Sequence, residues 1–184
     1  MSQAKGEIRP ALLSDVDALA PLFLDFFNED GIAVDPAAIR ANLERMLRDD
    51  RACVFVADAG SGIVGMASGS LTFGVEFGCA AEVEDLYVVP SCRGNGLAKA
   101  LLNRVLSWAD SQNASETYLI ITEEAERDQG LTRFYEGFGF KASQRLMMYR
   151  GRGVTAGQMT SSGTREKPSK RKAPVSVNAT PRCG

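Results

Sequence analysis

The stretch that decides the fold is EDLYVVPSCRGNGLAKAL, residues 84–101. Its first part alternates like a strand and ends at Pro90, and a helical pattern begins directly after a loop that holds Gly94 and Gly96. Glycines let a backbone approach a ligand closely, because no Cβ intervenes. The first turn of a helix carries backbone N–H groups without intrahelical partners, and these attract anions. The stretch therefore predicts a strand–loop–helix unit that binds a phosphorylated ligand.

Strands and helices alternate on both sides of this unit. The patterns predict strands over residues 7–11, 52–57, 63–73, 82–89, 117–122 and 140–149, and helices over 15–28 (capped by Ser14), from Asp35-Pro36 onward, over 96–112 and over 128–138. A turn at 58–62 joins two of the strands as an antiparallel hairpin. The order of elements predicts an α/β fold, a mixed, mostly antiparallel central sheet of about six to seven strands flanked by about four helices.

Charge divides the chain of 184 residues into two parts. Residues 1–150 carry 14 Lys and Arg against 22 Asp and Glu, and this acidic body predicts one domain that favours cationic ligands over nucleic acid. Residues 151–184 carry 7 Lys and Arg against a single acidic residue. They are rich in Gly, Ser, Thr and Pro, and this composition predicts a basic, disordered tail.

Several features are missing from the sequence. No apolar run approaches the ~18–20 residues that span a bilayer, and the N-terminus has no apolar region typical of a secretory signal. The four cysteines form no CxxC pair and the chain has no histidine, so we expect no metal site. These features predict a cytoplasmic protein without a membrane partner. A homodimer is compatible with the sequence.

The loop differs from two well-known nucleotide-binding loops. It lacks the GxxxxGK(S/T) pattern, and it lacks GxGxxG because Gly96 is followed by Leu97-Ala98-Lys99. It matches Arg-x-x-Gly-x-Ala over residues 93–98, directly after a strand that ends in Val-x-Pro. Downstream, residues 134–140 read FYEGFGF. In these two motifs, and over residues 7–150 as a whole, the chain resembles the GNAT superfamily of acetyl-CoA-dependent N-acetyltransferases.

The resemblance implies acetyl-CoA as the co-substrate. Its pyrophosphate is expected on the backbone amides of the loop, formed by Arg93, Gly94, Asn95, Gly96, Leu97, Ala98 and Lys99. The backbones of Leu86 and Val88 are expected to pair with the pantetheine arm as a further strand does. Asp128 stands where the family often has an asparagine that contacts this arm, and Leu131 stands where it often has alanine. An ionised aspartate cannot donate the hydrogen bond that asparagine donates.

The chemistry of acetyl transfer narrows the catalytic candidates. An alkyl ammonium has a pKa of about 10, so a group of the enzyme or water must take its proton near neutral pH. Without histidine, this group is a carboxylate, a tyrosinate or water. Strict alternation predicts Glu82, Glu84, Leu86 and Val88 on one face of the strand and Asp85, Tyr87 and Val89 on the other.

The run Glu84–Val88 resembles the polyamine and diamine branch of the superfamily, which implies Glu84 as the proton acceptor, with Asp85 as the second candidate. These carboxylates alternatively only attract a cation or pair with an arginine. Tyr135 stands where the family has its general acid, and the alternative is a core aromatic residue.

The acceptor site is expected among the first two helices, the loop at residues 74–79 and the last strands. Its carboxylates and aromatic rings suit a small cation; the candidates are Asp25, Glu29, Asp30, Glu76, Phe73 and Phe77, with Glu82 as a charge at the entrance. The alternative is that these acids are ordinary solvated surface residues. The function expected is transfer of an acetyl group to a primary amine of a small cationic acceptor (an aminoglycoside, a polyamine or a lysine-like amine) in a ternary complex. The alternatives are a protein or peptide N-acetyltransferase and a non-catalytic acetyl-CoA-binding regulatory module.

Overall fold

The structure is a computed structural model that describes residues 6–145, 147 and 148. Five strands form one sheet in the order β1-β2-β3-β4-β5; they are β1 (Glu7–Pro10), β2 (Ala52–Asp58), β3 (Ile63–Gly74), β4 (Gly78–Val88) and β5 (Glu116–Leu119). Neighbours from β1 to β4 are antiparallel, and β5 runs parallel to β4. This confirms the prediction of a mixed, mostly antiparallel sheet in an α/β fold.

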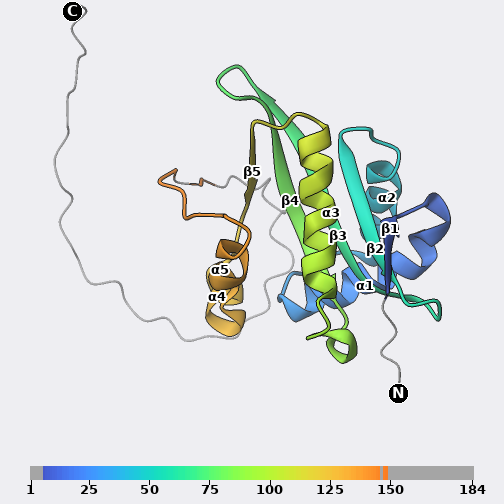
Figure 1. Ribbon diagram of the computed structural model, residues 1–184. Helices are drawn as coiled ribbons and strands as arrows, with labels where there is room; N and C mark the ends of the chain where they lie inside the picture. The colour runs from blue at the N-terminus through green and yellow to red at the C-terminus, as the bar shows by residue number, and fades with distance from the viewer. Residues whose placement is uncertain (1–5, 146, 149–184) are drawn as a thin grey trace, which may run out of the picture. The chain divides into compact units, whose positions relative to one another are not determined.

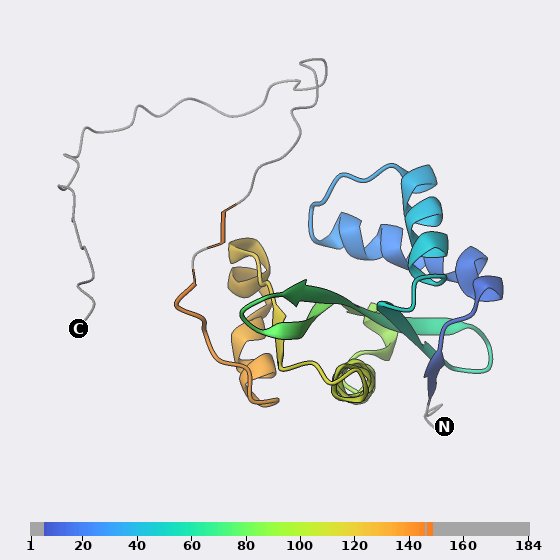
Figure 2. The ribbon, with the colours of Figure 1, turned by 90° about the horizontal axis from the view of Figure 1, so that it is seen from above.

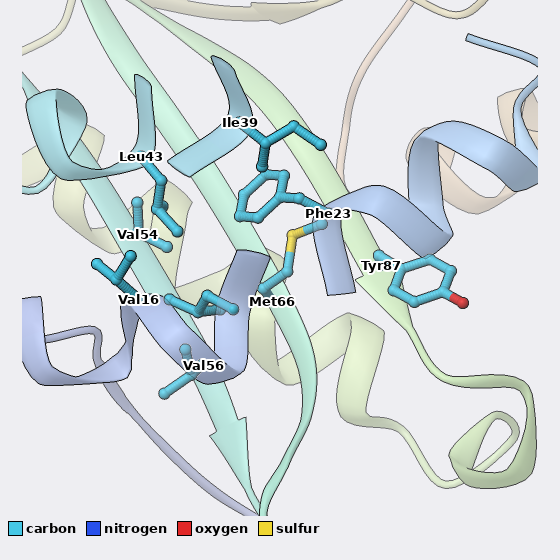
Figure 3. Packing of buried hydrophobic residues seen from close by; sticks show 9 residues of the cluster. Val16, Phe23, Ile39, Leu43, Val54, Val56, Met66 and Tyr87 are labelled. Carbon is cyan, nitrogen blue, oxygen red and sulfur yellow. The ribbon is translucent and has the colours of Figure 1, made fainter. Parts of the chain in front are cut away.

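Helices cover both faces of the sheet (Figures 1 and 2). They are α1 (Val16–Glu29), α2 (Pro36–Met46), α3 (Leu97–Ser111), α4 (Glu123–Gln129) and α5 (Leu131–Glu136). On one face, apolar residues of α1 and α2 pack against β2, β3 and β4, as Phe23, Ile39, Val54 and Met66 show in Figure 3. On the other face, Leu101 and Val105 of α3 are fully buried against the same strands. Among the described residues, each helix is too short or too polar to span a lipid bilayer.

Local signals explain where the first two helices begin. Asp35 accepts a hydrogen bond from the backbone N–H of Ala37 (3.0 Å), and Pro36 is the first residue of α2, as predicted. The prediction that Ser14 caps α1 is wrong. Leu13–Asp15 is a 3-10 turn, and the Asp15 carboxylate accepts from the N–H of Leu12 (2.7 Å), so α1 begins at Val16.

Three predictions about the last elements are wrong. The strand predicted over 117–122 ends at Leu119, and the helix predicted over 128–138 is two helices, because Gly130 lies between them with a φ of 62°. Residues 140–145, 147 and 148 form no strand, so the sheet has five described strands instead of six to seven. Instead, the Phe140 N–H donates to the carbonyl of Tyr135 (3.3 Å), and its ring packs on that of Tyr135, which closes the turn after α5.

A bulge in β4 decides which way its acidic residues point. Ser68 of β3 pairs with Asp85, and the next β3 residue pairs with Val83, so Glu84 is an extra residue in the register. An extra residue shifts the alternation of side chains by one. Ser68 and Ser70 lie on one face of β3, and their hydroxyl groups donate to Asp85 and to Glu84. The prediction that these two carboxylates lie on opposite faces is therefore wrong.

The same bulge separates Glu84 from Leu86 and Val88, which were predicted to share its face. Leu86 and Val88 pack in the cluster under α3, together with Val83. Tyr87 packs in the cluster under α1 and α2. Beyond the bulge the predicted alternation holds, but the acidic residues lie on the α1 side and Leu86 and Val88 lie on the α3 side.

The chain divides into two compact units, Met1–Ala142 and Ser143–Gly184. All the elements above belong to the first unit. In the second, the N–H of Arg145 donates a hydrogen bond to Ser143 Oγ (3.0 Å). The predicted basic tail, residues 151–184, lies outside the described residues.

Candidate active site

A cavity opens where β4 and β5 separate. The two strands pair over residues 80–83 of β4, and the rest of β4 has no strand neighbour on that side among the described residues. The cavity has a volume of about 430 Å3. Its walls come from the end of α1, from β4, from the loop and helix that follow β4, from the segment after β5, and from α4 and α5. Residues distant in the sequence thus meet in one site.

The backbone of β4 presents hydrogen-bonding groups to this cavity. The N–H of Val89 donates to the carbonyl of Val64 in β3 (3.0 Å). Because backbone groups alternate sides along a strand, those of Val88 and Leu86 point away from β3, toward the open edge. The Val88 carbonyl accepts there from Arg93 Nε (2.8 Å). An extended ligand can pair with such an edge as an added strand.

The loop after β4 has the form that its glycines predict. Gly94 and Gly96 have φ angles of 78° and 80°, in the left-handed region that favours glycine. A Cβ added to either would meet no atom within 4 Å, so the backbone here faces open space. No side chain caps the N-terminus of α3, which leaves its first N–H groups for a ligand. The Asn95 side chain instead donates to the Cys92 carbonyl (3.3 Å).

The first three residues of α3 have three different environments. Leu97 is buried under the sheet, Ala98 lines the cavity, and Lys99 is exposed.

Arg93 ties the loop to the end of α1. Its guanidinium lies 2.8 Å from the carboxylate of Glu29 and 5.4 Å from the centre of the Tyr87 ring. The hydrogen bond from Arg93 is the main cause that lowers the pKa of Glu29. Arg93 was predicted to bind the coenzyme and Glu29 to bind the acceptor. In the structure the two side chains form an ion pair with each other.

Glu84 and Asp85 face the cavity side by side, each held by a serine of β3. Ser70 Oγ donates to Glu84 and Ser68 Oγ donates to Asp85, both at 2.5 Å. Glu84 is exposed. Asp85 is more deeply placed, and burial raises its pKa to about 6; the hydrogen bond from Ser68 opposes this shift and the charge of Glu84 adds to it.

Tyr135 of α5 lines the same cavity. Burial is the main cause that raises its pKa to about 12, and the charge of Asp30 adds to the effect. Its ring packs edge-to-face against Phe134, with centroids 5.1 Å apart. The phenol is therefore protonated near neutral pH and can donate a proton or a hydrogen bond.

Other predicted residues lie outside the cavity lining. Asp25 is exposed on α1, and Asp128 is exposed on α4, where Arg127 donates to it (3.2 Å). Glu76 and Phe77 are in the turn between β3 and β4. Glu82 accepts from the hydroxyl of Tyr118 (3.0 Å), and burial raises its pKa.

The structure also places residues in or beside the cavity to which the sequence did not point. Gln129 lines the cavity, one residue after Asp128. Ser68 and Ser70 hold the two carboxylates of β4. Small polar residues at every second position of β3, from Ser68 to Thr72, were the signal for the serines. No comparable signal marked Gln129.

Comparison with known proteins agrees with this geometry. The model of the acetyltransferase (GNAT) family matches residues 16–140. Aminoglycoside N(6')-acetyltransferase type 1 of Salmonella typhimurium is 28% identical over 116 residues, which cover 61% of this chain and 78% of that protein. N-acetyltransferase 8F1 of Mus musculus is 32% identical over 98 residues, which cover 53% of this chain and 43% of that protein.

Solved structures share the fold. An integron cassette protein from the mobile metagenome of Cole Harbour Salt Marsh aligns with a TM-score of 0.67 at 26% identity, over 78% of this chain and 89% of that chain. Aminoglycoside N-acetyltransferase AAC(6')-Iy in complex with CoA aligns with a TM-score of 0.67 at 23% identity, over 79% and 94% of the two chains. The family fold binds acetyl-CoA. The chain thus belongs to the GNAT family and is an N-acetyltransferase.

Proposed function

We propose that this protein transfers the acetyl group of acetyl-CoA to a primary amine of a small cationic acceptor, directly within a ternary complex. The observation that carries the proposal is the cavity in which Glu84 and Asp85 of β4 and Tyr135 of α5 meet beside the open edge of β4. It combines groups that accept a proton, a group that donates one, and negative charge that attracts a cation. Family membership supports the same reaction.

The residues around the loop fit the donor. The backbone at Gly94 and Gly96 faces open space, and the uncapped start of α3 at Leu97 favours a phosphate group. The open edge at Leu86 and Val88 fits the pantetheine arm. When bound, acetyl-CoA supplies an activated thioester.

Two further positions bear on the donor. Asp128 was predicted to contact the pantetheine arm, but it lies outside the cavity lining, and Gln129 is better placed because it lines the cavity and its amide can donate. Arg93 and Lys99 contribute positive charge near the loop, although Arg93 is engaged with Glu29.

Glu84 is the proton acceptor in this proposal. It is exposed on the cavity wall, where water or an amine can reach it, and Ser70 holds one of its oxygens. Asp85 is the second candidate, and its raised pKa, about 6, makes it a stronger base than an ordinary aspartate while leaving it mostly ionised at neutral pH. Both carboxylates favour an ammonium group in this part of the cavity.

Tyr135 is the proton donor. Because burial keeps the phenol protonated, it can give a proton to the sulfur that departs from the acetyl group. Its packing against Phe134 and Phe140 holds the ring in place. Four residues that were predicted to bind the acceptor lie outside the cavity lining: Asp25, Glu76, Phe77 and Glu82. Their role in guiding the acceptor into the cavity stays a prediction.

The test is a thiol-release assay with acetyl-CoA and a panel of acceptors: diamines and polyamines, aminoglycosides, lysine analogues and a basic peptide. We expect turnover on a small cationic amine. Turnover on the peptide alone would show that the acceptor is a protein or peptide instead of a small amine. If calorimetry showed acetyl-CoA binding and no acceptor released thiol, the proposed reaction would be wrong and a regulatory acetyl-CoA-binding role would stand in its place.

A further inference from the structure

The cavity holds more negative charge than one ammonium group can balance. Its described lining contains the carboxylates of Glu29, Asp30, Glu84 and Asp85, and one cationic side chain, that of Arg93. Arg93 is already paired with Glu29 at 2.8 Å. Three carboxylates remain without a cation among the described lining residues, and a ligand with one positive charge would balance one of them.

Asp30 differs from the other two. Glu84 and Asp85 each accept a hydrogen bond from a serine, whereas the described residues offer the Asp30 carboxylate no hydrogen bond and no ion pair. Asp30 caps the C-terminal end of α1, where its N–H donates to the carbonyl of Phe26 (3.0 Å). The carboxylate is half-buried, and burial followed by the charge of Glu29 raises its pKa. A cation bound beside Asp30 would offset both the loss of solvation and the repulsion from Glu29.

The position of Asp30 sets it apart from the bulge in β4. It lies on the wall made by α1, and its charge acts both on Asp85 of β4 and on Tyr135 of α5. It therefore lies close to the reacting groups but on a different element. An acceptor whose reacting nitrogen is at Glu84 has a second carboxylate within the same cavity.

Apolar side chains cover the wall next to Asp30. Phe26, Phe27 and Ile32 line the cavity from α1 and the segment after it. Such a wall suits methylene groups, whereas the many hydroxyl groups of an amino sugar would lose hydrogen bonds to water there without replacement. A flexible aliphatic chain between two ammonium groups matches both the charge and the apolar wall.

We propose that Asp30 is a specificity-determining residue that binds a second ammonium group of the acceptor, which is therefore an aliphatic diamine or polyamine. This inference rests on the proposed function and narrows its acceptor. It stands on a cavity that belongs to an N-acetyltransferase, on the unpaired carboxylate at its wall and on the apolar surface beside it.

The test compares 1,4-diaminobutane with butylamine, which has the same carbon chain without the second ammonium. Thiol release gives kcat and KM for each, and calorimetry gives the affinity for diaminobutane in the absence of acetyl-CoA. We expect the diamine to have a KM at least about ten-fold lower, the effect of one charge-assisted pair. In a series from 1,3-diaminopropane to 1,6-diaminohexane, KM should pass through a minimum.

Variants of Asp30 separate binding from folding. Asp30→Asn should raise KM for diaminobutane about ten-fold with little change in kcat, weaken its calorimetric affinity similarly, and leave KM for butylamine unchanged. Asp30→Glu should restore part of the diamine preference. Asp17→Asn is the matched control, because Asp17 is an exposed carboxylate on the same helix outside the cavity lining. Acetyl-CoA affinity and melting temperature show whether each variant is folded.

The outcomes distinguish this inference from the proposed function. If no amine releases thiol, the proposed function itself fails. If amines react but the wild type uses butylamine as efficiently as diaminobutane, or prefers an aminoglycoside such as neamine, the function stands and the role of Asp30 is wrong. Equal effects of Asp30→Asn on both amines would also overturn the role.

Discussion

The guanidinium of Arg93 and the carboxylate of Glu29 lie 2.8 Å apart, although 64 positions separate them in the sequence. The pair joins the loop at the start of α3 to the end of α1. It also removes one carboxylate and the one described lining cation from the electrostatic balance of the cavity. In the proposed reaction, the acceptor therefore meets Asp30, Glu84 and Asp85.

Replacing Glu29 should affect the acceptor more than the fold. The two side chains are 43% and 35% exposed, so the pair contributes at most about 0.5–1 kcal/mol to the free energy of unfolding. Glu29→Gln leaves the charge of Arg93 unbalanced in the cavity, which should raise KM for a cationic amine several-fold. Asp17→Asn removes an exposed ion pair with Arg40 elsewhere and serves as control. Equal KM values for both variants would contradict the argument.

Replacing Tyr135 tests the proton donor. Tyr135→Phe keeps the ring and its packing but removes the hydroxyl. We therefore expect kcat to fall about 100-fold or more, while the affinity for acetyl-CoA stays within about two-fold of the wild-type value. Because the pKa of Tyr135 is about 12, its loss should lower the rate evenly between pH 6 and pH 9. Thiol release and calorimetry measure the two quantities. Tyr118→Phe, which removes a hydroxyl outside the cavity lining, should leave kcat near the wild-type value.

Replacing Glu84 tests the proton acceptor. Glu84→Gln should lower the rate most at low pH, where unprotonated amine is scarcest and removal of its proton matters most. The measurement is kcat/KM for the best amine across pH 6 to 9. Glu116→Gln is the control, since Glu116 is an exposed glutamate of β5 outside the cavity lining and has no predicted role in the reaction. A profile for Glu84→Gln that overlays the wild type would show that Glu84 is not the base.

The half-buried carboxylate of Asp85 should make stability depend on pH. Its pKa is raised from 3.8 to about 6, so the folded state binds this proton more tightly than the unfolded state. The folded protein therefore loses stability as pH rises from about 4 to about 6, by up to about 3 kcal/mol. Asp85→Asn removes this loss. The difference in free energy of unfolding between Asp85→Asn and the wild type should therefore shift in favour of the variant as pH rises from about 4 to about 6, and should be constant above about pH 6.

Urea unfolding at pH 4.5, 5.5, 6.5 and 7.5 measures this difference, with the exposed Asp25→Asn variant as control. A constant difference between Asp85→Asn and the wild type at all four pH values would show that Asp85 titrates as it does in the unfolded chain.

The loop glycine should matter for the coenzyme beyond its effect on the fold. Gly96 has a φ of 80°, where an alanine costs about 1–2 kcal/mol. Gly96→Ala should lower the melting temperature and also weaken acetyl-CoA binding at least about ten-fold, because the backbone must reshape where it meets the phosphate groups. Gly60→Ala is matched, since Gly60 has a φ of 78° in the turn between β2 and β3. If both variants lost coenzyme affinity equally, the loop would not be the phosphate site.

Much of the fold could be predicted from the sequence because its signals are local. The loop with Gly94 and Gly96 needs a left-handed backbone, and Asp35-Pro36 supplies its own helix start. The final strand could not be predicted correctly in this way. Phe140 has the apolar character of a strand residue, but it packs against Tyr135 and closes a turn.

The sequence by itself determined the strand–loop–helix unit over residues 84–101 and the types of residue that a transfer site needs. The tertiary structure decided which of them meet. Glu84 and Asp85 face the same way because β3 pairs with β4 in a register that leaves Glu84 without a pairing partner. Arg93 meets Glu29 because α1 packs on the sheet beside the loop. Register and packing depend on contacts between distant segments, and the periodicity of one segment carries no information about the partner it will find.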